Sequence, residues 1–348
     1  MTSQLSRRAL LRHHGDVDAT PGLADFAVNV RLDRPPGWLS DRLAAALGRL
    51  GRYPSAADDA VAREAVADRH DRHADHVLIL NGAAEGFTLL PLLKPRLAAV
   101  VHPSFTEPEV ALADAGVPIR RVQLDPEDGF RLRPELVPDE ADLVVVGNPT
   151  NPTSVLHPAR ALVELAKPGR TVVVDEAFMD SVPGEAESLA CVDLPGLLVF
   201  RSLTKTWALP GLRVGYAVGR PALLARIAAY RPQWPVGTLA LEAVLACSGP
   251  AAVAEARSAA VETCAHRVSF GAALAEVPGV HVYQPAYAPF LLLRVPGGDR
   301  VRGALRDRGI AVRRGDTFPG LDSDYLRVAV RSPERTAPLL TAMREVLT

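Results

Sequence analysis

Short apolar segments that alternate with helical stretches are the feature that most constrains how this chain can fold. Before residue 239 such segments occupy residues 77–80, 98–101, 143–146, 172–174, 197–200 and 214–218. Strands that are apolar throughout, and that are separated by helices, are typical of a mostly parallel sheet covered on both faces. We therefore expect an α/β fold with a large, mostly parallel sheet.

The pattern changes after residue 238. An Ala-rich stretch, interrupted at Gly249-Pro250, extends through Ala275. Beyond it, strands are expected at residues 280–283, 290–294 and 325–330, with helices near Arg302 and after Pro333. We predict an N-terminal arm (1–38), a large α/β domain (39–238) and a smaller C-terminal α+β domain (239–348).

Charge and cysteine content narrow the possible partners and location. The 348 residues include 39 Lys+Arg and 40 Asp+Glu, so the net charge is -1. The basic excess that is typical of nucleic-acid-binding proteins is absent, so we do not expect nucleic acid as a partner. Three cysteines are too few for a disulfide framework, which favours a reducing compartment. Arg7-Arg8 precedes the polar run 13–18 rather than an apolar export segment, and no apolar run is long enough to span a membrane. We expect a cytoplasmic protein.

Several common cofactor signatures are absent from the sequence. It contains neither a G-x-x-x-x-G-K-[ST] phosphate loop nor a G-x-G-x-x-G turn between a strand and a helix. The nine histidines lack the spacing of metal ligands, so no metal is predicted. His70 and His73 lie at a polar helix end, where we expect them to be solvated.

Lysine is rare, and its positions are informative. The chain has lysine only at Lys94, Lys167 and Lys205, and arginine supplies the other basic side chains. Arginine stays protonated, whereas a lysine with a lowered pKa can act as an amine nucleophile. Lys94 and Lys167 each precede proline and are expected on the surface. Lys205 lies among hydroxyl side chains and an arginine, in the run 200–216.

Four segments carry the chemistry. They are V-V-V-D-E-A-F at 172–178, R-S-L-T-K-T-W-A-L-P-G-L-R at 201–213, N-P-T-N-P-T at 148–153 and N-G-A-A-E-G at 81–86. Lys205 follows Asp175 by 30 residues and precedes Arg213 by eight. In this order and spacing, the segments resemble the fold-type I pyridoxal-phosphate (PLP) enzymes of the class I/II aminotransferase family. The resemblance covers nearly the whole chain and implies the PLP-transferase fold.

The resemblance implies a role for each matching residue. Lys205 would bind PLP covalently, and Asp175 would keep the pyridine nitrogen protonated. Asn151 would bind the ring O3′ and Phe105 would stack on the ring, while Phe178 stands where most aminotransferases carry tyrosine. The phosphate would be held by Ser202, Thr204, Arg213 and the amides of Ala83 and Ala84 at a helix start. Tyr53 would reach the PLP phosphate of a second subunit, which implies a homodimer.

Within the family, the chain resembles the branch of histidinol-phosphate aminotransferase and threonine-phosphate decarboxylase. His14-Gly15-Asp16 is similar to a His-Gly-Gly segment of the decarboxylases, with Asp16 as a departure. Asn29, Arg313 and Arg327 would complete the substrate site, the arginines as anion clamps.

We expect a PLP-dependent enzyme that acts on the amino group of a small, phosphorylated amino acid. The leading hypothesis is a threonine-phosphate decarboxylase of cobalamin biosynthesis. The alternative is a transaminase, for example on histidinol phosphate with 2-oxoglutarate. A second alternative is a catalytically idle PLP-binding module.

Overall fold

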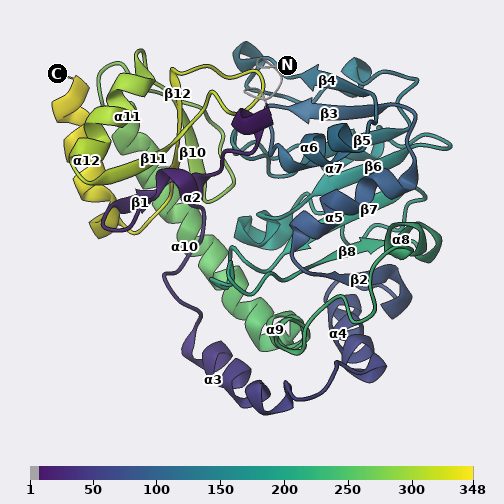
Figure 1. The fold of residues 1–348 in the computed structure, drawn as a ribbon. Helices are drawn as coiled ribbons and strands as arrows, with labels where there is room; N and C mark the ends of the chain where they lie inside the picture. The colour runs from purple at the N-terminus through teal and green to yellow at the C-terminus, as the bar shows by residue number, and fades with distance from the viewer. Residues whose placement is uncertain (1–7, 348) are drawn as a thin grey trace.

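Seven strands form the larger of two sheets in the computed structural model, which describes residues 8–347 (Figure 1). Arg7 and the start of the predicted arm therefore lie outside the described residues. The strand order is β2–β8–β7–β6–β5–β3–β4, and β8 is antiparallel to both neighbours while the other pairs are parallel. The bounds are β2 Val77–Leu80, β3 Ala98–His102, β4 Ile119–Gln123, β5 Leu143–Gly147, β6 Thr171–Asp175, β7 Leu197–Ser202 and β8 Gly215–Gly219. The predicted α/β fold with a mostly parallel sheet is confirmed.

Both faces of this sheet are covered, because successive side chains of each strand point to opposite faces. Val172 and Val174 of β6 pack into one core with α4, α7 and α9, and Val173 packs into the other with α5, α6 and α8. The helices are α4 Ala56–Arg69, α5 Ala83–Leu89, α6 Glu107–Asp114, α7 Ala159–Val163, α8 Pro221–Ala228 and α9 Thr238–Ser248. Short 3-10 helices connect them at Leu47–Arg49, Ala74–His76, Leu90–Leu93, Pro126–Asp128, Pro134–Leu136, Met179–Ser181 and Pro183–Glu185.

The smaller sheet joins the two ends of the chain. Its order is β1–β11–β12–β10–β9, and β1 pairs with β11 in parallel (Figure 1). One face packs against α11, α12 and the end of α10, and the other face presents Arg313 and Arg327, which are directly opposed across β11 and β12. The bounds are β1 Ala24–Phe26, β9 His281–Val282, β10 Phe290–Arg294, β11 Ile310–Arg314, β12 Tyr325–Ala329, α2 Gly15–Asp18, α11 Gly298–Asp307 and α12 Pro333–Leu347.

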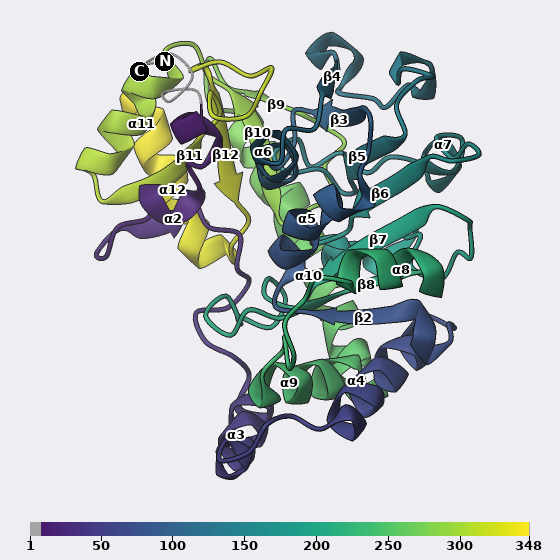
Figure 2. The ribbon, with the colours of Figure 1, turned by 45° about the vertical axis from the view of Figure 1, so that its right-hand side comes forward.

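A bent helix pair links the two sheets. The Ala-rich stretch breaks where the sequence predicts, since α9 ends at Ser248 and α10 spans Pro250–Ala275, with an angle of 72° between them. α9 packs against α3 (Gly37–Ala46) and α4, and α10 runs from there to the small sheet (Figure 2). Among residues 8–347 no single helix is long and apolar enough to cross a membrane, although this bent pair passes that test by length and composition. The predicted division into three segments stays a prediction.

A buried ion-pair network lies behind the carboxyl ends of β6 and β7. Arg201 of β7 pairs with Glu176, which follows β6, at 3.0 Å, and with Asp180. Arg69 of α4 reaches Asp180 at 2.8 Å and Glu185 at 2.9 Å. Breaking one partner of such a pair leaves an uncompensated buried charge, so the network holds these segments together.

The expectation for His70 is wrong, whereas that for His73 is confirmed. His73 is exposed, but His70 is buried and its Nε2 lies 2.8 Å from the hydroxyl of Tyr216 in β8. The helix end is polar in sequence, yet α4 lies on the sheet and turns His70 toward it.

We predict that Gly86→Ala destabilises the fold, because α5 approaches β7 through this glycine. A Cβ at Gly86 would lie 2.8–3.0 Å from three ring atoms of Phe200. The free energy of unfolding should fall by about 1–3 kcal/mol, as in other overpacked cores. Gly303→Ala in α11, where a Cβ meets nothing within 4 Å, is the control and should stabilise by about 0.5–1 kcal/mol. Denaturant unfolding of both variants measures this, and equal stability of the two would contradict it.

Candidate active site

The carboxyl ends of β6 and β7 bring the predicted catalytic residues together. Their parallel pairing sets Asp175 opposite Phe200, and the chain then continues through Ser202 to Lys205. Ligands of open α/β sheets bind at this edge. A cavity of about 120 Å³ lies there, lined by Ala83, Ala84, Phe87, Phe105, Pro149, Asn151, Asp175, Ala177, Phe178, Ser202, Thr204, Lys205 and Arg213.

Lys205 supplies the amine side chain on the wall of this cavity. Burial lowers its pKa to about 8, and the nearby cations Arg327 and Arg213 act in the same direction, while Asp175 opposes them. The other two lysines, Lys94 and Lys167, are exposed as predicted. A lysine with a pKa near 8 is partly neutral at physiological pH, so it can act as a nucleophile and can exchange protons.

Asp175 faces the same cavity with little compensation for its charge. Burial raises the pKa of Asp175 to about 6. A hydrogen bond from the amide of Ala177 at 3.1 Å and the charge of Lys205 act in the opposite direction and lower the pKa, but by less. A buried carboxylate of this kind is stabilised by a cationic partner such as a pyridinium nitrogen.

Hydroxyls and a guanidinium gather at one end of the cavity. The hydroxyl oxygens of Ser202 and Thr204 lie 2.7 Å apart and are buried. Arg213 lies against Gly82, where φ is +84° and a Cβ would come within 2.9 Å of Arg213 Nη2. Ala83 and Ala84 follow at the start of α5. These donors and this cation match the needs of a phosphate.

Three further predicted residues line the cavity where a ring would lie. Phe105 and Phe178 are both on its wall, and the Lys205 Nζ lies 5.9 Å from the centre of the Phe178 ring. Asn151 is also on the wall, and its Oδ1 accepts a hydrogen bond from Arg327 Nη1 at 2.6 Å. The cavity thus offers an amine, a carboxylate, hydrogen-bond donors for a phosphate and aromatic side chains for a ring, and this combination fits PLP.

A second chamber of about 440 Å³ adjoins the first and contains the predicted substrate residues. The two chambers share Lys205, Phe105, Asn151, Phe178 and Arg213. The second is also lined by His14, Gly15, Asp16, Ala27, Val28, Asn29, Val30, Pro210, Arg313, Phe318 and Arg327. Residues from both ends of the chain therefore form it.

The two arginines of this chamber differ in how they are paired. Arg313 Nη1 lies 3.3 Å from Asp18, and its Nη2 donates to the carbonyl of His13 at 2.6 Å. Arg327 donates to the carbonyl of Ala27, and within residues 8–347 its buried Nε has no partner. Burial lowers the pKa of Arg327 to about 9, and the adjacent charge of Arg313 adds to this. Arg327 is therefore the guanidinium with unused charge for a substrate anion.

Asn29 has an unsatisfied side chain in the same chamber. It is buried, and neither its Nδ2 nor its Oδ1 has a hydrogen-bond partner in the described part of the chain. A buried amide without partners is costly, and a polar ligand would satisfy it.

Tyr53 lies outside both chambers in the single chain. Its side chain is 72% exposed and stacks on Trp234, with ring centroids 4.2 Å apart. Its predicted contact with a second subunit stays a prediction.

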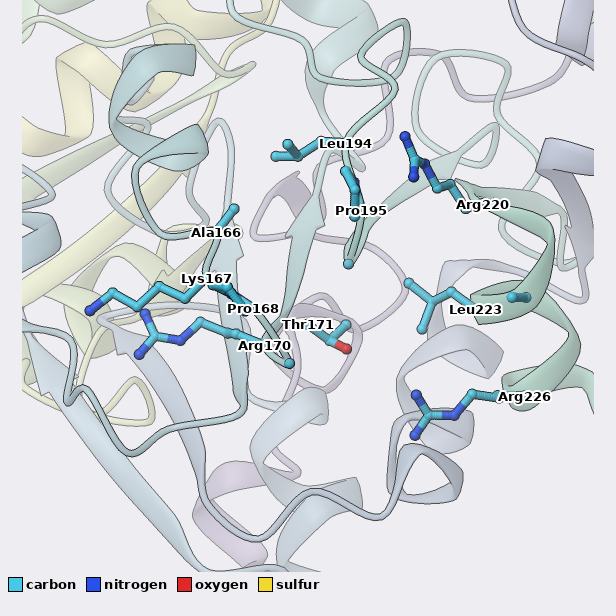
Figure 3. A pocket seen from close by; sticks show the side chains of 13 residues that line it. Ala166, Lys167, Pro168, Arg170, Thr171, Leu194, Pro195, Arg220, Leu223 and Arg226 are labelled. Atoms are coloured by element: carbon cyan, nitrogen blue, oxygen red, sulfur yellow. The ribbon is translucent and has the colours of Figure 1, made fainter.

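A larger cavity, of about 680 Å³, lies at the opposite ends of β6 and β7 (Figure 3). Arg220 and Arg226 lie on one side, and Lys167 and Arg170 on the other. Each already has a partner: Arg220 pairs with Asp193, Arg226 with the carbonyl of Leu93, Lys167 with Asp139 and Arg170 with several carbonyls. These four cations are therefore engaged within the chain.

Comparison with known proteins settles the family. The profile of aminotransferase class I and II matches residues 25–343. The chain belongs to the class I and II aminotransferase family. It is therefore a PLP-dependent enzyme with the PLP fold type I, as predicted, and the idle-module alternative has no support.

Relatives with two different activities lie within this family. The chain is 57% identical to a histidinol-phosphate aminotransferase of Mycobacterium tuberculosis, over 93% of this chain and 88% of that one. It is 36% identical to the threonine-phosphate decarboxylase of Salmonella typhimurium, over 94% and 92%. The crystal structure of the Clostridium acetobutylicum histidinol-phosphate aminotransferase matches with a TM-score of 0.83 at 23% identity, covering 92% of this chain and 98% of that one. At that identity, the structural match shows the fold alone.

Sequence reasoning missed some residues that shape the site. Asp18 pairs with Arg313, and Phe318 lies under Arg313, with the guanidinium carbon 4.9 Å from the ring centre. Neither stands in a motif, and the Asp18–Arg313 contact joins residues 295 positions apart, so no local signal predicts it.

We predict that Lys205 becomes nucleophilic near pH 8 rather than near 10.5. Its lowered pKa means that the neutral amine forms as the pH rises through about 8. Reductive methylation of the cofactor-free protein, followed by mass spectrometry, should show labelling of Lys205 with that midpoint. Labelling of exposed Lys94 in the same digest corrects for the pH dependence of the reagent. A midpoint above pH 10 for Lys205 would refute this.

Proposed function

We propose that the protein is a transaminase that removes the amino group from histidinol phosphate, or a closely similar amine phosphate, and passes it to 2-oxoglutarate. The 57% identity with histidinol-phosphate aminotransferases across 93% of the chain carries this proposal. It replaces threonine-phosphate decarboxylation as the leading reading, because the decarboxylase relative is more distant, at 36%.

The residues of the two chambers have distinct tasks in this reaction. When bound, PLP supplies an electron sink for the carbon that carries the amino group. Lys205 Nζ holds or releases a proton there, since its lowered pKa allows both states near neutral pH. Asp175 stabilises a cation at the ring, and Ser202, Thr204 and Arg213 anchor the phosphate of the cofactor. Arg327 orients the anionic group of the substrate.

Decarboxylation of threonine phosphate, a lyase reaction of cobalamin biosynthesis, is the second candidate. One observation favours it: Arg313 and Arg327 are directly opposed in the substrate chamber, where two guanidinium groups could hold a phosphate and leave a carboxylate free. Phe178 in place of tyrosine also fits a change in ring electronics. The substrate group that the two arginines would hold decides which other group of the substrate is left free to react.

We also propose that the active form is a homodimer in the cytoplasm. Large apolar and aromatic side chains are exposed on α3, on the segment that follows α3, and on the segment that precedes α9. They are Trp38, Leu47, Leu50, Tyr53, Tyr230 and Trp234. Such a surface favours burial in a subunit interface. Three free cysteines, of which Cys191 is exposed, suit a reducing compartment.

The reaction can be decided with the PLP-loaded enzyme. We expect histidinol phosphate to convert the cofactor to its pyridoxamine form, which absorbance follows, and 2-oxoglutarate to restore it. Threonine phosphate should release no CO2. Release of CO2 from threonine phosphate, with no pyridoxamine formed from histidinol phosphate, would instead support the lyase.

The dimer proposal predicts a cofactor-binding role for the Tyr53 hydroxyl. Tyr53→Phe should leave the dimer intact in sedimentation but weaken PLP binding about three- to tenfold, the effect of one lost hydrogen bond. Tyr230→Phe is the control, since Tyr230 is 75% exposed and belongs to the same apolar surface but has no predicted contact with the cofactor. A monomer with full activity, or equal PLP affinity in the two variants, would contradict the proposal.

A further inference from the structure

Asp16 is a carboxylate in the substrate chamber that the site described above leaves without a task. It lies on α2 and lines the chamber together with Lys205, Asn29 and Arg327. Within residues 8–347 it has neither a hydrogen-bond partner nor an ion-pair partner. Asp18, two residues later, is by contrast engaged by Arg313 at 3.3 Å and by His13 at 3.2 Å.

The backbone of α2, which carries the exposed Asp16, is held by contacts of the neighbouring residues. A Cβ at Gly15 would lie 2.4 Å from the carbonyl oxygen of Ala27, so α2 packs backbone to backbone against the segment after β1. His14 Nε2 lies 2.6 Å from Glu107 Oε1, and the His14 ring lies 5.2 Å from the Phe105 ring. α2 is thus held to the small sheet through Arg313 and to the large sheet through His14.

The balance of charge in the chamber makes Asp16 selective. Once a cofactor engages Arg213 and Asp175, the remaining groups are Lys205, Arg327, the Arg313–Asp18 pair, the nearby His14–Glu107 pair and Asp16. Arg327 satisfies one anionic group of a substrate. A nitrogen donor of a substrate near α2 would be attracted to Asp16. The charge of Asp16 reaches the reaction centre, because it raises the pKa of Lys205 against the effect of burial.

We propose that Asp16 determines specificity by accepting a hydrogen bond from a nitrogen donor at the far end of an amine phosphate substrate, such as an imidazole ring. This inference rests on the proposed transaminase function, and it identifies the part of the substrate that Asp16 would recognise.

Binding to the pyridoxamine-loaded enzyme tests it, because that form cannot react with an amine. Titration calorimetry compares histidinol phosphate with the analogue in which phenyl replaces imidazole. We expect Asp16→Asn to weaken binding of histidinol phosphate about tenfold, the effect of one hydrogen bond to a charged group. Binding of the phenyl analogue should change less than about twofold.

Asp139→Asn is the matched control, since Asp139 is 88% exposed and pairs with Lys167, at the other end of the sheet. It should change neither affinity. Equal effects of Asp16→Asn on histidinol phosphate and on the phenyl analogue, or no effect on either, would overturn the inference. The proposed function fails separately, if the PLP-loaded wild-type enzyme forms no pyridoxamine from histidinol phosphate.

Discussion

The parallel pairing of β6 with β7 is the constraint on which the site depends. It brings Asp175 and the segment that bears Lys205 to the same edge of the sheet. Arg201 of β7 forms ion pairs with Glu176 and Asp180, which follow β6, and so holds the ends of the two strands together. Separating the two strands would leave buried charges without partners, which costs free energy. The carboxylate and the amine therefore keep their relative positions without contacting each other directly.

Burial shifts the pKa values of Asp175 and Lys205 in opposite directions. It raises the pKa of Asp175 and lowers that of Lys205, because the charged form of either is poorly solvated there. Oppositely shifted values in one cavity are typical of acid–base sites. In the substrate chamber, burial likewise lowers the pKa of Arg327 to about 9, and among residues 8–347 this guanidinium is hydrogen-bonded to Asn151 and to the Ala27 carbonyl rather than to a carboxylate.

The sequence predicts most of the large sheet, because its central strands are apolar on both faces. It does not reveal β4, where Arg120, Arg121 and Gln123 interrupt the apolar pattern at an open sheet edge. Motif spacing likewise brings Lys205, Asp175 and Asn151 into one cavity. What it misses depends on tertiary contacts: the Asp18–Arg313 pair and the burial of His70 arise only when distant elements pack. The contact of Tyr53 with a second subunit lies beyond a single chain.

The parallel pairing of β1 with β11 has a consequence for synthesis on the ribosome. Residues that line the first chamber end at Arg213, but Ala24 finds its partner only at Ile310, and Arg327 comes later still. The first β-strand to emerge must therefore wait for the last third of the polypeptide before it can join a sheet. A nascent chain can therefore assemble the wall of the cofactor cavity well before it can complete the substrate chamber, and a truncated product would lack Arg313, Phe318 and Arg327.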